Sequence, residues 1–525
     1  MSPSSKERAQ LSYGIGRAAA GLKESEMELP EILAGVEIVS VTGPAEVEVR
    51  SITYDSRKGA PGTLFFALHG AKLEGVDFVS DAISRGAIAI ASENARPEGL
   101  QREISWVQLS SHSERRGLAR AAANFYGRPA NALKLTGVTG TNGKTTISFI
   151  VDSILRAAGF TTCLIGTTGY RTPQGSRKAV NTTPESLDLQ EMLAEVRDAG
   201  GSHAVMEVSS HALAMERVWG CHFAVAIFTN LTRDHLNFHK TFEDYFAAKR
   251  RLFEGTGAGA PDVAVINSDD PYAPRLEGLA RRTFTYGLDT DADLTTRNFA
   301  LSFDGLKFTA ETPAGKVSVR SALVGRINVY NILAAIGAGI GLEIPTHKIE
   351  EGIANLTLVP GRFQRIDEGQ PFYVVVDYAH ADDAMRNLIS TARELNPSGR
   401  IITVFGAGGE RDRSTRPHMG EASGSLSDLV ILTSDNPRSE DPLRIINDVV
   451  VGLQKVNANY KIEPDRDAAL EMAMDEARPG DIVLLAGKGH ENYQILRDRT
   501  FEFDDREKAR EILRRKGFSK EAAGR

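Results

Sequence analysis

The chain of 525 residues is too long for one hydrophobic core, and its length predicts about three domains. Hydrophobic residues make up 41% of it and charged residues 25%, as in an ordinary globular protein. The formal net charge of -7 argues against a protein built mainly to neutralise a nucleic acid backbone or an anionic membrane. Only two cysteines occur, Cys163 and Cys221, which excludes a disulfide framework and favours buried thiols in a reducing compartment.

The amino-terminal segment, residues 1–27, carries early charges and lacks the apolar core of a signal peptide, so we predict a tail there. A membrane span needs about 18 uninterrupted apolar residues, and the nearest candidate, residues 331–344, is shorter and interrupted by glycines. We expect that segment to be a buried helix. The sequence therefore predicts a cytoplasmic protein with no membrane span and no nucleic acid partner.

Three blocks follow the tail. In residues 28–131, short apolar runs alternate with helical stretches up to a connector at Gly127 and Pro129. In residues 132–359, apolar strands, glycine turns and amphipathic helices recur, with Gly159 placed as a helix stop. After the turn at 358–366, further strand-like runs fill residues 360–525. The predicted fold class is α/β with three domains: an N-terminal α/β domain, a central P-loop-like domain with a mostly parallel sheet, and a C-terminal Rossmann-like domain.

The segment GTNGKTT, residues 140–146, has the character of a phosphate loop between a strand and a helix. Backbone N–H groups of a glycine turn and of a helix amino terminus point at an anion, and Lys144 adds a positive charge. Thr145 is placed to bind magnesium. The match to the usual P-loop pattern is loose, because Val138 stands where that pattern has its first glycine. A plain strand-to-helix turn is the alternative interpretation.

Three more residues are candidates for chemistry. Glu207 ends one apolar run and His235 follows the next, and open α/β sheets collect ligand groups at such strand ends. Taken alone, both are more typical of surface or satisfied polar residues. Lys249 lies in a predicted helix that Thr241 begins, and the sequence by itself favours a solvated charge there.

A larger set of motifs resembles one family in order along nearly the whole chain. These motifs are YDSR at 54–57, NTTPES at 181–186, MEVSSHAL at 206–213, NLTRDHL at 230–236, YFAAKRRLF around Lys249, GRINVYNILAA from Gly325, DYAH at 377–380, GGERD from Gly408, DNPR at 435–438 and GKGHE at 487–491. Together with GTNGKTT they resemble the Mur ligase family.

The resemblance implies a function. The motifs are most similar to those of members that add meso-2,6-diaminopimelate to UDP-N-acetylmuramoyl-L-alanyl-D-glutamate, a step of peptidoglycan precursor synthesis. Such enzymes are ATP-dependent acid–amino-acid ligases that form ADP and phosphate through an acyl phosphate. By this resemblance, residues 28–131 bind the UDP substrate, residues 132–359 bind ATP and residues 360–525 bind the amino acid.

The resemblance also implies the residues of the ATP and metal sites. Lys144, Glu207, His235 and Lys249 correspond to the catalytic positions. Thr145 and Glu207 are implied ligands of a first Mg²⁺, and His235 and Lys249 of a second metal. An ammonium group has no lone pair, so Lys249 is expected to carry CO2 as N6-carboxylysine. The implied ATP-binding residues are Gly140, Thr141, Asn142, Gly143, Lys144, Thr145, Thr146, Asn267, Asn328, Arg362 and Asp377.

Two further substrate sites are implied in the same way. The UDP-substrate positions are Ser56, Ala71, Lys72, Leu73, Asn181, Thr182, Thr183, Ser209 and Arg217. The diaminopimelate positions are Arg411, Asp435, Asn436, Pro437, Arg438, Gly487 and Glu491. The planar guanidinium group of Arg438 can bind the distal carboxylate with two hydrogen bonds. Taken alone, Asn-Pro-Arg is more typical of a turn with a solvated arginine.

Two positions depart from the family pattern. Met215 stands where the family often has glutamine, and Ala381-Asp382 stands where it usually has Thr-Pro. Two alternative functions remain at this point. A folylpolyglutamate-synthase-like ligase would share the ATP chemistry but would not explain DNPR, GKGHE or a uridine-binding first domain. A nucleotide-switched binding protein without ligase chemistry would need only one metal.

Overall fold

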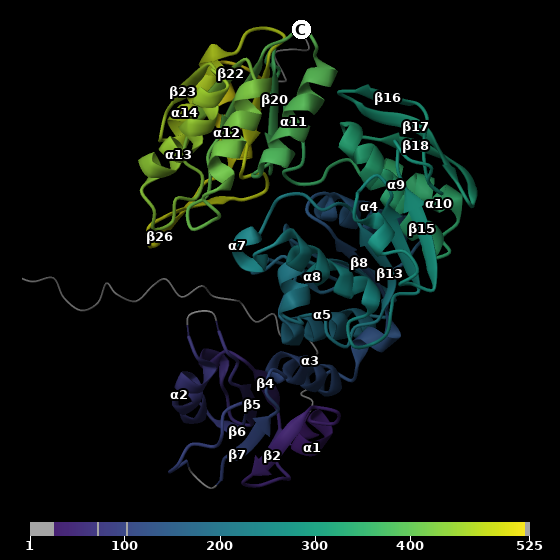
Figure 1. Cartoon of the computed structure of the whole chain (residues 1–525), viewed down its shortest axis with the longest axis vertical. Coiled ribbons are helices and arrows are strands. Elements are labelled where there is room, and N and C mark those ends of the chain that lie inside the picture. The colour runs from purple at the N-terminus through teal and green to yellow at the C-terminus, as the bar shows by residue number, and fades with distance from the viewer. Residues whose placement is uncertain (1–25, 71–72, 101–102, 520–525) are drawn as a thin grey trace, which may run out of the picture. The chain divides into compact units, whose positions relative to one another are not determined.

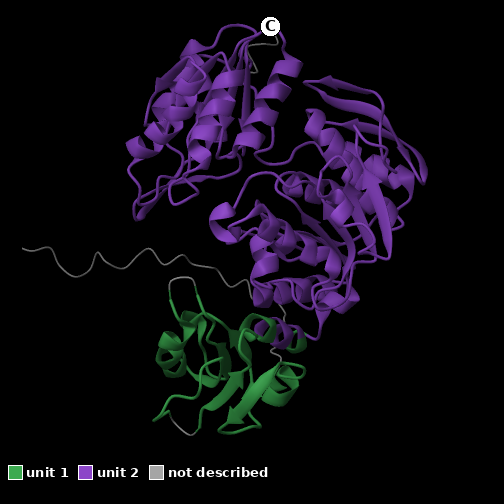
Figure 2. Cartoon of the chain, viewed as in Figure 1, with its two compact units in different colours: residues 1–117, 124–126 green, residues 118–123, 127–525 purple. Residues whose placement is uncertain are grey.

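The computed structural model describes residues 26–70, 73–100 and 103–519 (Figure 1). These residues form two compact units: the first runs to Gly117 and includes Asn124–Tyr126, and the second holds Leu118–Ala123 and the chain from Gly127 onward (Figure 2). The predicted tail lies outside the described residues except for its last two positions, and Ala71 and Lys72 lie outside them as well. Among the described residues, no helix is long and apolar enough to cross a membrane.

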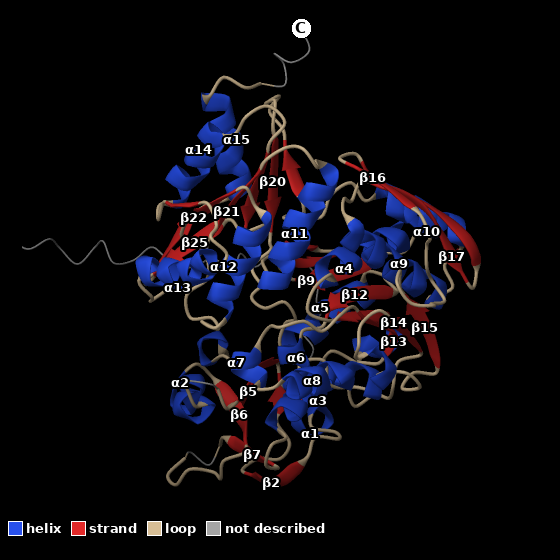
Figure 3. Ribbon diagram, turned by 45° about the horizontal axis from the view of Figure 1, so that its top comes forward, coloured by secondary structure: helices blue, strands red, loops and turns tan. Residues whose placement is uncertain are grey.

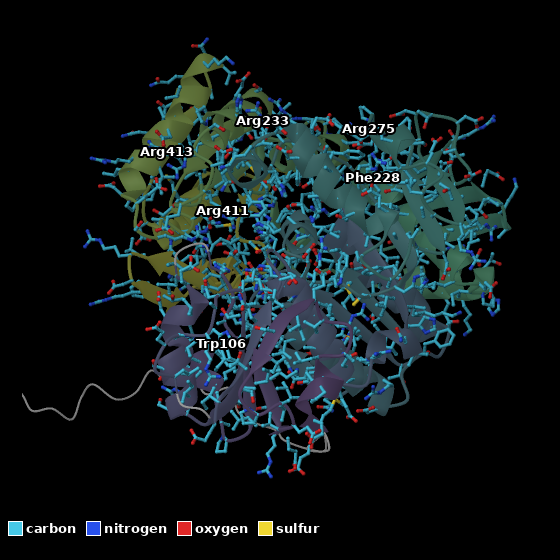
Figure 4. The ribbon with its side chains drawn as sticks, turned by 60° about the horizontal axis from the view of Figure 1, so that its bottom comes forward. Trp106, Phe228, Arg233, Arg275, Arg411 and Arg413 are labelled. Atoms are coloured by element: carbon cyan, nitrogen blue, oxygen red, sulfur yellow. The ribbon has the colours of Figure 1, made fainter. Side chains whose placement is uncertain are left out.

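The first unit is built on a five-stranded sheet with the order β2-β7-β6-β5-β4. Strand β2 is antiparallel to β7 and the other pairs are parallel. Trp106, labelled in Figure 4, is buried in its core and donates its indole N–H to the Asn94 carbonyl at 3.1 Å. The elements of this unit are β1 (Met27–Glu28), α1 (Leu29–Ile32), β2 (Ile38–Thr42), β3 (Glu48–Val49), β4 (Ser51–Thr53), η1 (Ser56–Lys58), β5 (Thr63–Phe66), η2 (Gly75–Phe78), α2 (Val79–Ser84), β6 (Ala87–Ser92), β7 (Ser105–Leu109) and α3 (Glu114–Phe125).

The second unit begins with an eight-stranded sheet of order β11-β10-β9-β12-β8-β13-β14-β15. From β9 to β15 all neighbours are parallel, whereas β10 and β11 add an antiparallel edge. Parallel strands that are buried on both faces consist of continuous apolar residues, and for this reason the sequence alone predicts strands in these segments. The strands are β8 (Lys134–Thr139), β9 (Thr162–Gly166), β10 (Gly169–Thr172), β11 (Gly175–Arg177), β12 (His203–Glu207), β13 (Phe223–Phe228), β14 (Val263–Asn267) and β15 (Arg282–Tyr286).

Helices cover both faces of this sheet (Figure 3). One apolar core joins the sheet to α4, α9 and α10, and a second core on the other face includes α5 and α8. The segment predicted as a buried helix lies in α9 and is buried, as expected. The helices are η3 (Pro129–Ala132), α4 (Lys144–Ala157), α5 (Ser186–Asp198), α6 (Ser210–Ala214), α7 (Leu236–His239), α8 (Phe242–Glu254), η4 (Ala273–Arg275), α9 (Arg326–Gly341) and α10 (Thr346–Asn355). An antiparallel sheet of β16 (Phe299–Ser302), β17 (Gly305–Thr312) and β18 (Gly315–Ser321) packs on the first of these cores.

A six-stranded sheet of order β19-β20-β24-β21-β22-β23 follows, parallel except for β19. Helices α11, α12 and α13 share the core on one face, and α14 and α15 share the core on the other. The elements are β19 (Gln364–Ile366), β20 (Tyr373–Asp377), α11 (Asp382–Leu395), β21 (Ile401–Phe405), α12 (Thr415–Leu426), β22 (Leu429–Leu432), α13 (Pro442–Lys455), β23 (Tyr460–Ile462), α14 (Arg466–Glu476), β24 (Ile482–Ala486), β25 (Tyr493–Leu496), β26 (Arg499–Glu502) and α15 (Asp505–Arg515). The predicted α/β class with mostly parallel sheets is confirmed, and the boundaries 28–131, 132–359 and 360–525 stay predictions.

Local signals in the sequence act as expected at two helix ends. Helix α4 ends before Gly159, which adopts a left-handed φ of 90°. Helix α8 begins after Thr241, whose side chain accepts a hydrogen bond from the N–H of Asp244. Both cysteines are buried, so the expectation of buried thiols is confirmed, and burial raises the pKa of each thiol to about 12.

Candidate active site

The loop at residues 140–146 connects β8 to the amino terminus of α4. Glycine is required at two of its positions. A Cβ added to Gly140 would lie 1.7 Å from Thr229 Oγ1. A Cβ added to Gly143, which caps α4 with a φ of 89°, would lie 2.6 Å from Asn331 Oδ1. The loop therefore packs closely against β13 and α9, while the first turn of α4 points its free backbone N–H groups into a cavity of about 250 Å³, here called the first cavity.

A carboxylate lies beside this helix terminus. Glu207 ends β12, the strand that pairs with β8, and its side chain is buried. Its Oε1 accepts hydrogen bonds from Thr145 Oγ1 at 3.0 Å and from the Thr167 N–H at 2.8 Å, and its Oε2 accepts one from Thr167 Oγ1 at 3.0 Å. Gly166 leaves room for it, since a Cβ there would lie 2.2 Å from Oε1. The hydroxyl of Thr145 and the carboxylate of Glu207, predicted to share a metal, are thus in contact.

Two lysines share one carbonyl oxygen behind the loop. Lys144 Nζ donates to Gly140 O at 2.9 Å, and Lys249 Nζ, from α8, donates to the same oxygen at 2.8 Å. The Lys249 side chain is only 2% exposed. Burial, followed by the positive charge of Lys144, holds the pKa of Lys249 well below its usual value. The sequence-based interpretation of Lys249 as a solvated charge was wrong, because α8 turns this residue toward the loop rather than toward water.

His235 lies just before α7 in a left-handed backbone conformation with φ 55°. Its Nε2 is 3.3 Å from Asp234 Oδ2, and its ring contacts the His211 ring edge to face with centroids 4.7 Å apart. Burial lowers the pKa of His235 to about 3, against the opposing charge of Asp234, so the imidazole is neutral and carries a lone pair. The residue lines the first cavity.

The oxygen atoms of Thr145 and Glu207 are ligands of the kind that Mg²⁺ requires. This ion prefers oxygen ligands and is commonly held by one or two carboxylates together with substrate phosphates. Thr145 and Glu207 fit that requirement at the helix terminus. Within the described residues, no group of three or more His, Cys, Asp and Glu side chains could hold a metal on its own. A second metal near His235 would therefore need a further anionic ligand, which a carbamate on Lys249 would supply.

Residues just before β19 and from the end of β20 onward complete the first cavity. Arg362 Nη2 donates to Thr145 Oγ1 at 3.2 Å, and its guanidinium lies 4.7 Å from the Tyr378 ring centre. Asp377 is held by the N–H groups of Phe363 at 2.7 Å and Ala379 at 2.8 Å. Thr141, Asn142, Thr146, Asn328, Arg362 and Asp377 all line this cavity.

Asn267 lies apart from the predicted ATP residues that line the first cavity. It lies at the end of β14, its Nδ2 donates to Thr229 O at 2.8 Å, and its Oδ1 accepts from the Asp269 N–H at 3.1 Å. Both ends of the amide are thus bonded to backbone, and the residue is not among those that line the first cavity. Its predicted contact with ATP stays a prediction.

A second cavity of about 160 Å³ adjoins the first. Six residues line both: Asp234, His235, Tyr378, His380, Ala381 and Arg411. Six of the seven predicted diaminopimelate residues line it, namely Arg411, Asp435, Asn436, Arg438, Gly487 and Glu491. Arg411 and Arg413, labelled in Figure 4, lie two residues apart on the loop before α12, but Arg413 pairs with Asp448 at the surface.

Arg438 and Glu491 lie on two different loops of the second cavity. Arg438 adopts a φ of 54° and donates from Nη1 to Gly409 O at 2.7 Å. Glu491 Oε2 accepts from Asn436 Nδ2 at 2.8 Å. Burial, followed by the charge of Asp435, raises the pKa of Glu491. The cavity thus offers a cation and a carboxylate, the pair that a zwitterionic amino acid group requires.

The predicted UDP-substrate residues fall in both units. In the first unit, Ser56 begins η1 and is buried, whereas Leu73 is exposed. In the second, Thr183 joins two of the others and Glu207: its Oγ1 donates to Glu207 O, its Oγ1 accepts from the Ser209 N–H, and its carbonyl accepts from Arg217 Nη1 at 3.0 Å. Asn181 O accepts from the Tyr170 hydroxyl, and Thr182 Oγ1 lies 3.2 Å from Thr167 Oγ1.

Sequence reasoning did not single out several side chains of these cavities. Thr167 holds Glu207, His380 lines both cavities, Arg416 is buried and lines the second, and Lys488 is buried beneath the second. Lys488 stands inside the GKGHE motif and Asp234 inside NLTRDHL, so both could have been noticed there. Nothing in the local sequence points to Thr167. At the departures from the family pattern, Met215 Sδ accepts from Arg217 Nη2 at 3.6 Å, and Ala381 caps α11 without a side-chain hydrogen bond.

Comparisons with known proteins identify the class. Three family models match: the Mur ligase middle domain over residues 138–339, the Mur ligase glutamate ligase domain over 361–489, and the Mur ligase family catalytic domain over 48–126. The chain therefore belongs to the Mur ligase family.

Individual relatives are more specific. The chain is 53% identical to the UDP-N-acetylmuramoyl-L-alanyl-D-glutamate--2,6-diaminopimelate ligase of Solibacter usitatus, over 94% of this chain and 99% of that protein. It is 41% identical to the ligase of the same name from Syntrophomonas wolfei, over 93% and 100%. A solved structure of a ligase of this name overlays with a TM-score of 0.63 at 32% identity, covering 94% of this chain and all of the other.

Proposed function

We propose that this chain is an ATP-dependent amide ligase that joins meso-2,6-diaminopimelate to UDP-N-acetylmuramoyl-L-alanyl-D-glutamate and releases ADP and phosphate. The names of relatives that match it over nearly their whole length support this substrate pair. The observation that carries the proposal is the junction of the two cavities: a loop suited to phosphates and a pocket with paired charges share six lining residues. Two reactants held on either side of that junction would meet there.

The chemistry needs both cavities. A carboxylate does not condense with an amine at neutral pH, so an oxygen of the glutamate carboxylate attacks the γ-phosphorus of ATP, the bond to the bridging oxygen breaks, and ADP leaves. The amine nitrogen then attacks the acyl carbon, phosphate leaves, and the amine loses a proton. Because the first step joins two anions, positive charge must surround the transferred group.

Residues of the first cavity would supply that charge. Lys144 and Arg362 bring cations to the helix terminus, where Arg362 already contacts Thr145. Thr145 and Glu207 would hold Mg²⁺, which neutralises phosphate charge when bound. His235 and a carbamate on Lys249 would hold a second metal. A buried amine without a proton is the form that adds CO2, and the environment of Lys249 favours that form. Asn142, Asn328 and Asp377 would contact the nucleotide.

The second cavity would hold the amino acid. Its distal stereocentre carries a carboxylate and an ammonium group, which Arg438 and Glu491 can pair with respectively. The remaining UDP-substrate residues, Thr182, Thr183, Ser209 and Arg217 among them, would bind the muramoyl dipeptide next to Glu207. A cytoplasmic location remains a prediction.

Two other functions are less well supported. A folylpolyglutamate synthase of Mycobacterium tuberculosis overlays with a TM-score of 0.58 over 70% of this chain, but at 17% identity this likeness shows the fold alone. A nucleotide-switched binding protein would not need a charged pocket joined to the phosphate loop.

The test is ADP release by the purified full chain with ATP, Mg²⁺ and the UDP-dipeptide, with meso-diaminopimelate or L-lysine as the amine. We expect kcat/KM for meso-diaminopimelate to exceed that for L-lysine at least about a hundredfold, because L-lysine would leave Arg438 facing no anion. Comparable values would show that Arg438 does not read the distal carboxylate. If neither amine led to ADP release, the proposed function would be contradicted.

A further inference from the structure

One buried lysine lies directly behind the second cavity. Lys488, on the loop that follows β24, has no exposed side-chain surface and does not line either cavity. Its Nζ lies 3.5 Å from Asp435 Oδ1, 3.4 Å from Asn436 Oδ1 and 3.6 Å from Glu491 Oε2. A buried ammonium without partners would be strongly destabilising, so this charge is retained only because these three acceptors surround it. All three belong to residues that do line the second cavity.

Lys488 fixes which way the Asn436 amide points. Asn436 Oδ1 accepts from the Ile495 N–H at 2.9 Å and lies 3.4 Å from Lys488 Nζ, so donors surround this end of the amide. The other end must then be the nitrogen, which donates to Glu491 Oε2 at 2.8 Å. A neutral side chain at position 488 would leave the Ile495 N–H as the sole donor that holds this orientation.

Lys488 also acts on the charge of Glu491. Burial and the neighbouring Asp435 raise the pKa of this carboxyl, and Lys488, the Asn436 amide and Arg438 oppose that rise. Other charged or titratable groups that act on Glu491 come from the loop after β20, from α14 and from β25: Tyr378, Arg466 and Tyr493. Lys488 is the cation within ion-pair distance of both Glu491 and Asp435, so its removal would leave the two carboxylates facing each other.

We propose that Lys488 is the positioning residue of the amino-acid pocket: from behind the cavity it holds the Asn436 amide so that its nitrogen donates to Glu491, and it keeps Glu491 negatively charged for the substrate ammonium. The inference rests on the proposed function. Lys488 does not touch the substrate, and its effect is confined to the amino acid because its three acceptors all lie in the second cavity.

The experiment compares the wild-type chain with Lys488→Met, which keeps the length of the side chain and removes its charge, and with Lys488→Gln, which keeps a donor without charge. Steady-state ADP release is measured against meso-diaminopimelate and against ATP from about pH 5.5 to 9. We expect KM for diaminopimelate to rise at least about tenfold in Lys488→Met at neutral pH, with KM for ATP unchanged. Lys488→Gln should show a smaller rise, because its amide can still donate to Asn436.

The pH profile separates positioning from a purely structural role. Glu491 binds an ammonium only as a carboxylate, so kcat/KM for diaminopimelate is full above the pKa of Glu491 and is lost as pH falls through it. Because Lys488 lowers that pKa, its removal should move this acidic limb to higher pH. A residue needed only for packing would reduce activity equally at all pH values and for both substrates.

Lys455→Met is the matched control, since Lys455 is an exposed lysine of α13 that pairs with Glu421. It should leave both KM values and the pH profile as in the wild type. An unmoved acidic limb, or equal changes in both KM values, would overturn the inference while the proposed function stands. If wild-type chain releases no ADP with diaminopimelate, both fail. Should neither Lys488 variant fold, Glu491→Gln decides: the acidic limb must disappear in it, and its persistence would refute the inference.

Discussion

The two cavities of the second unit share a border but are built from different parts of the chain. The first cavity is formed around a glycine loop, the amino terminus of α4 and the end of β12. The second is formed by side chains on the loops after β21, β22 and β24, with charged groups buried beneath them. Backbone N–H groups bind any phosphate in the same way, whereas placed charges distinguish one amino acid from another.

The charges beneath the second cavity also hold its loops. Arg466, at the start of α14, is fully buried and pairs with Asp505, the first residue of α15. It donates to Ser434 O at 3.2 Å and to Ala486 O at 3.0 Å, the carbonyls just before Asp435 and Gly487. Arg416 in the same manner donates to Gly408 O at 3.1 Å. We therefore expect changes beneath the second cavity to reduce stability and changes in the first to reduce catalysis alone.

The largest expected effect is that of Asp505→Asn. It leaves the Arg466 cation buried without its carboxylate, which typically costs about 3 to 5 kcal/mol. The urea transition of the C-terminal sheet should therefore come at a lower concentration. Glu421→Gln, which breaks the exposed pair with Lys455, is the control and should leave the urea midpoint near that of the wild type. Equal stability of the two variants would contradict the contrast between the cavities.

Lys144→Met comes next. The lysine is buried beside the loop, and we expect kcat to fall on the order of 10² to 10³-fold, because a cation that stabilises the transferred group is lost. Removing a buried charge leaves no carboxylate unpaired here, since Lys144 Nζ bonds only to carbonyl oxygens. The urea midpoint should consequently stay near that of the wild type. Strong unfolding of this variant would show that the first cavity also depends on its charge for stability.

Arg438→Ala tests the role of a charged side chain in the second cavity. KM for meso-diaminopimelate should rise up to about a hundredfold while KM for ATP stays constant, because the contact is with a remote part of the amino acid. Steady-state kinetics with each substrate varied in turn measure both constants. Arg413→Ala, which removes a surface pair two residues from Arg411, is the control. A parallel rise in both KM values would mean that Arg438 supports the loops rather than the substrate.

The smallest effect is expected for rescue of Lys249→Ala. The variant should lose at least about tenfold in activity, as removal of a metal-site group commonly does, and short-chain carboxylates should restore part of it by taking the place of the carbamate. Activity is measured with increasing acetate and with chloride at equal ionic strength. Undiminished turnover in the variant, or the same response to both salts, would exclude a carbamate on this lysine.

Short-range signals in the sequence determined much of the protein. The apolar runs of β8, β12, β13 and β14 predict a parallel sheet, since strands buried on both faces cannot alternate in polarity. Gly159 and Thr241 predict helix ends through backbone geometry and capping that involve only a few neighbouring residues. GTNGKTT predicts its own position between a strand and a helix. Each of these signals lies within a few neighbouring residues of the sequence.

Only the tertiary structure decided the surroundings of the charged residues. The sequence of its helix predicts a solvated Lys249. In the structure the residue is buried, and its Nζ donates a hydrogen bond to the carbonyl of Gly140, 109 residues earlier. Arg466 and Asp505 are 39 residues apart, and Lys488 meets Asp435 and Asn436 across more than 50. The burial that shifts the pKa values of Lys249, His235 and Glu491 arises from packing between elements distant in sequence, so no local pattern contains it.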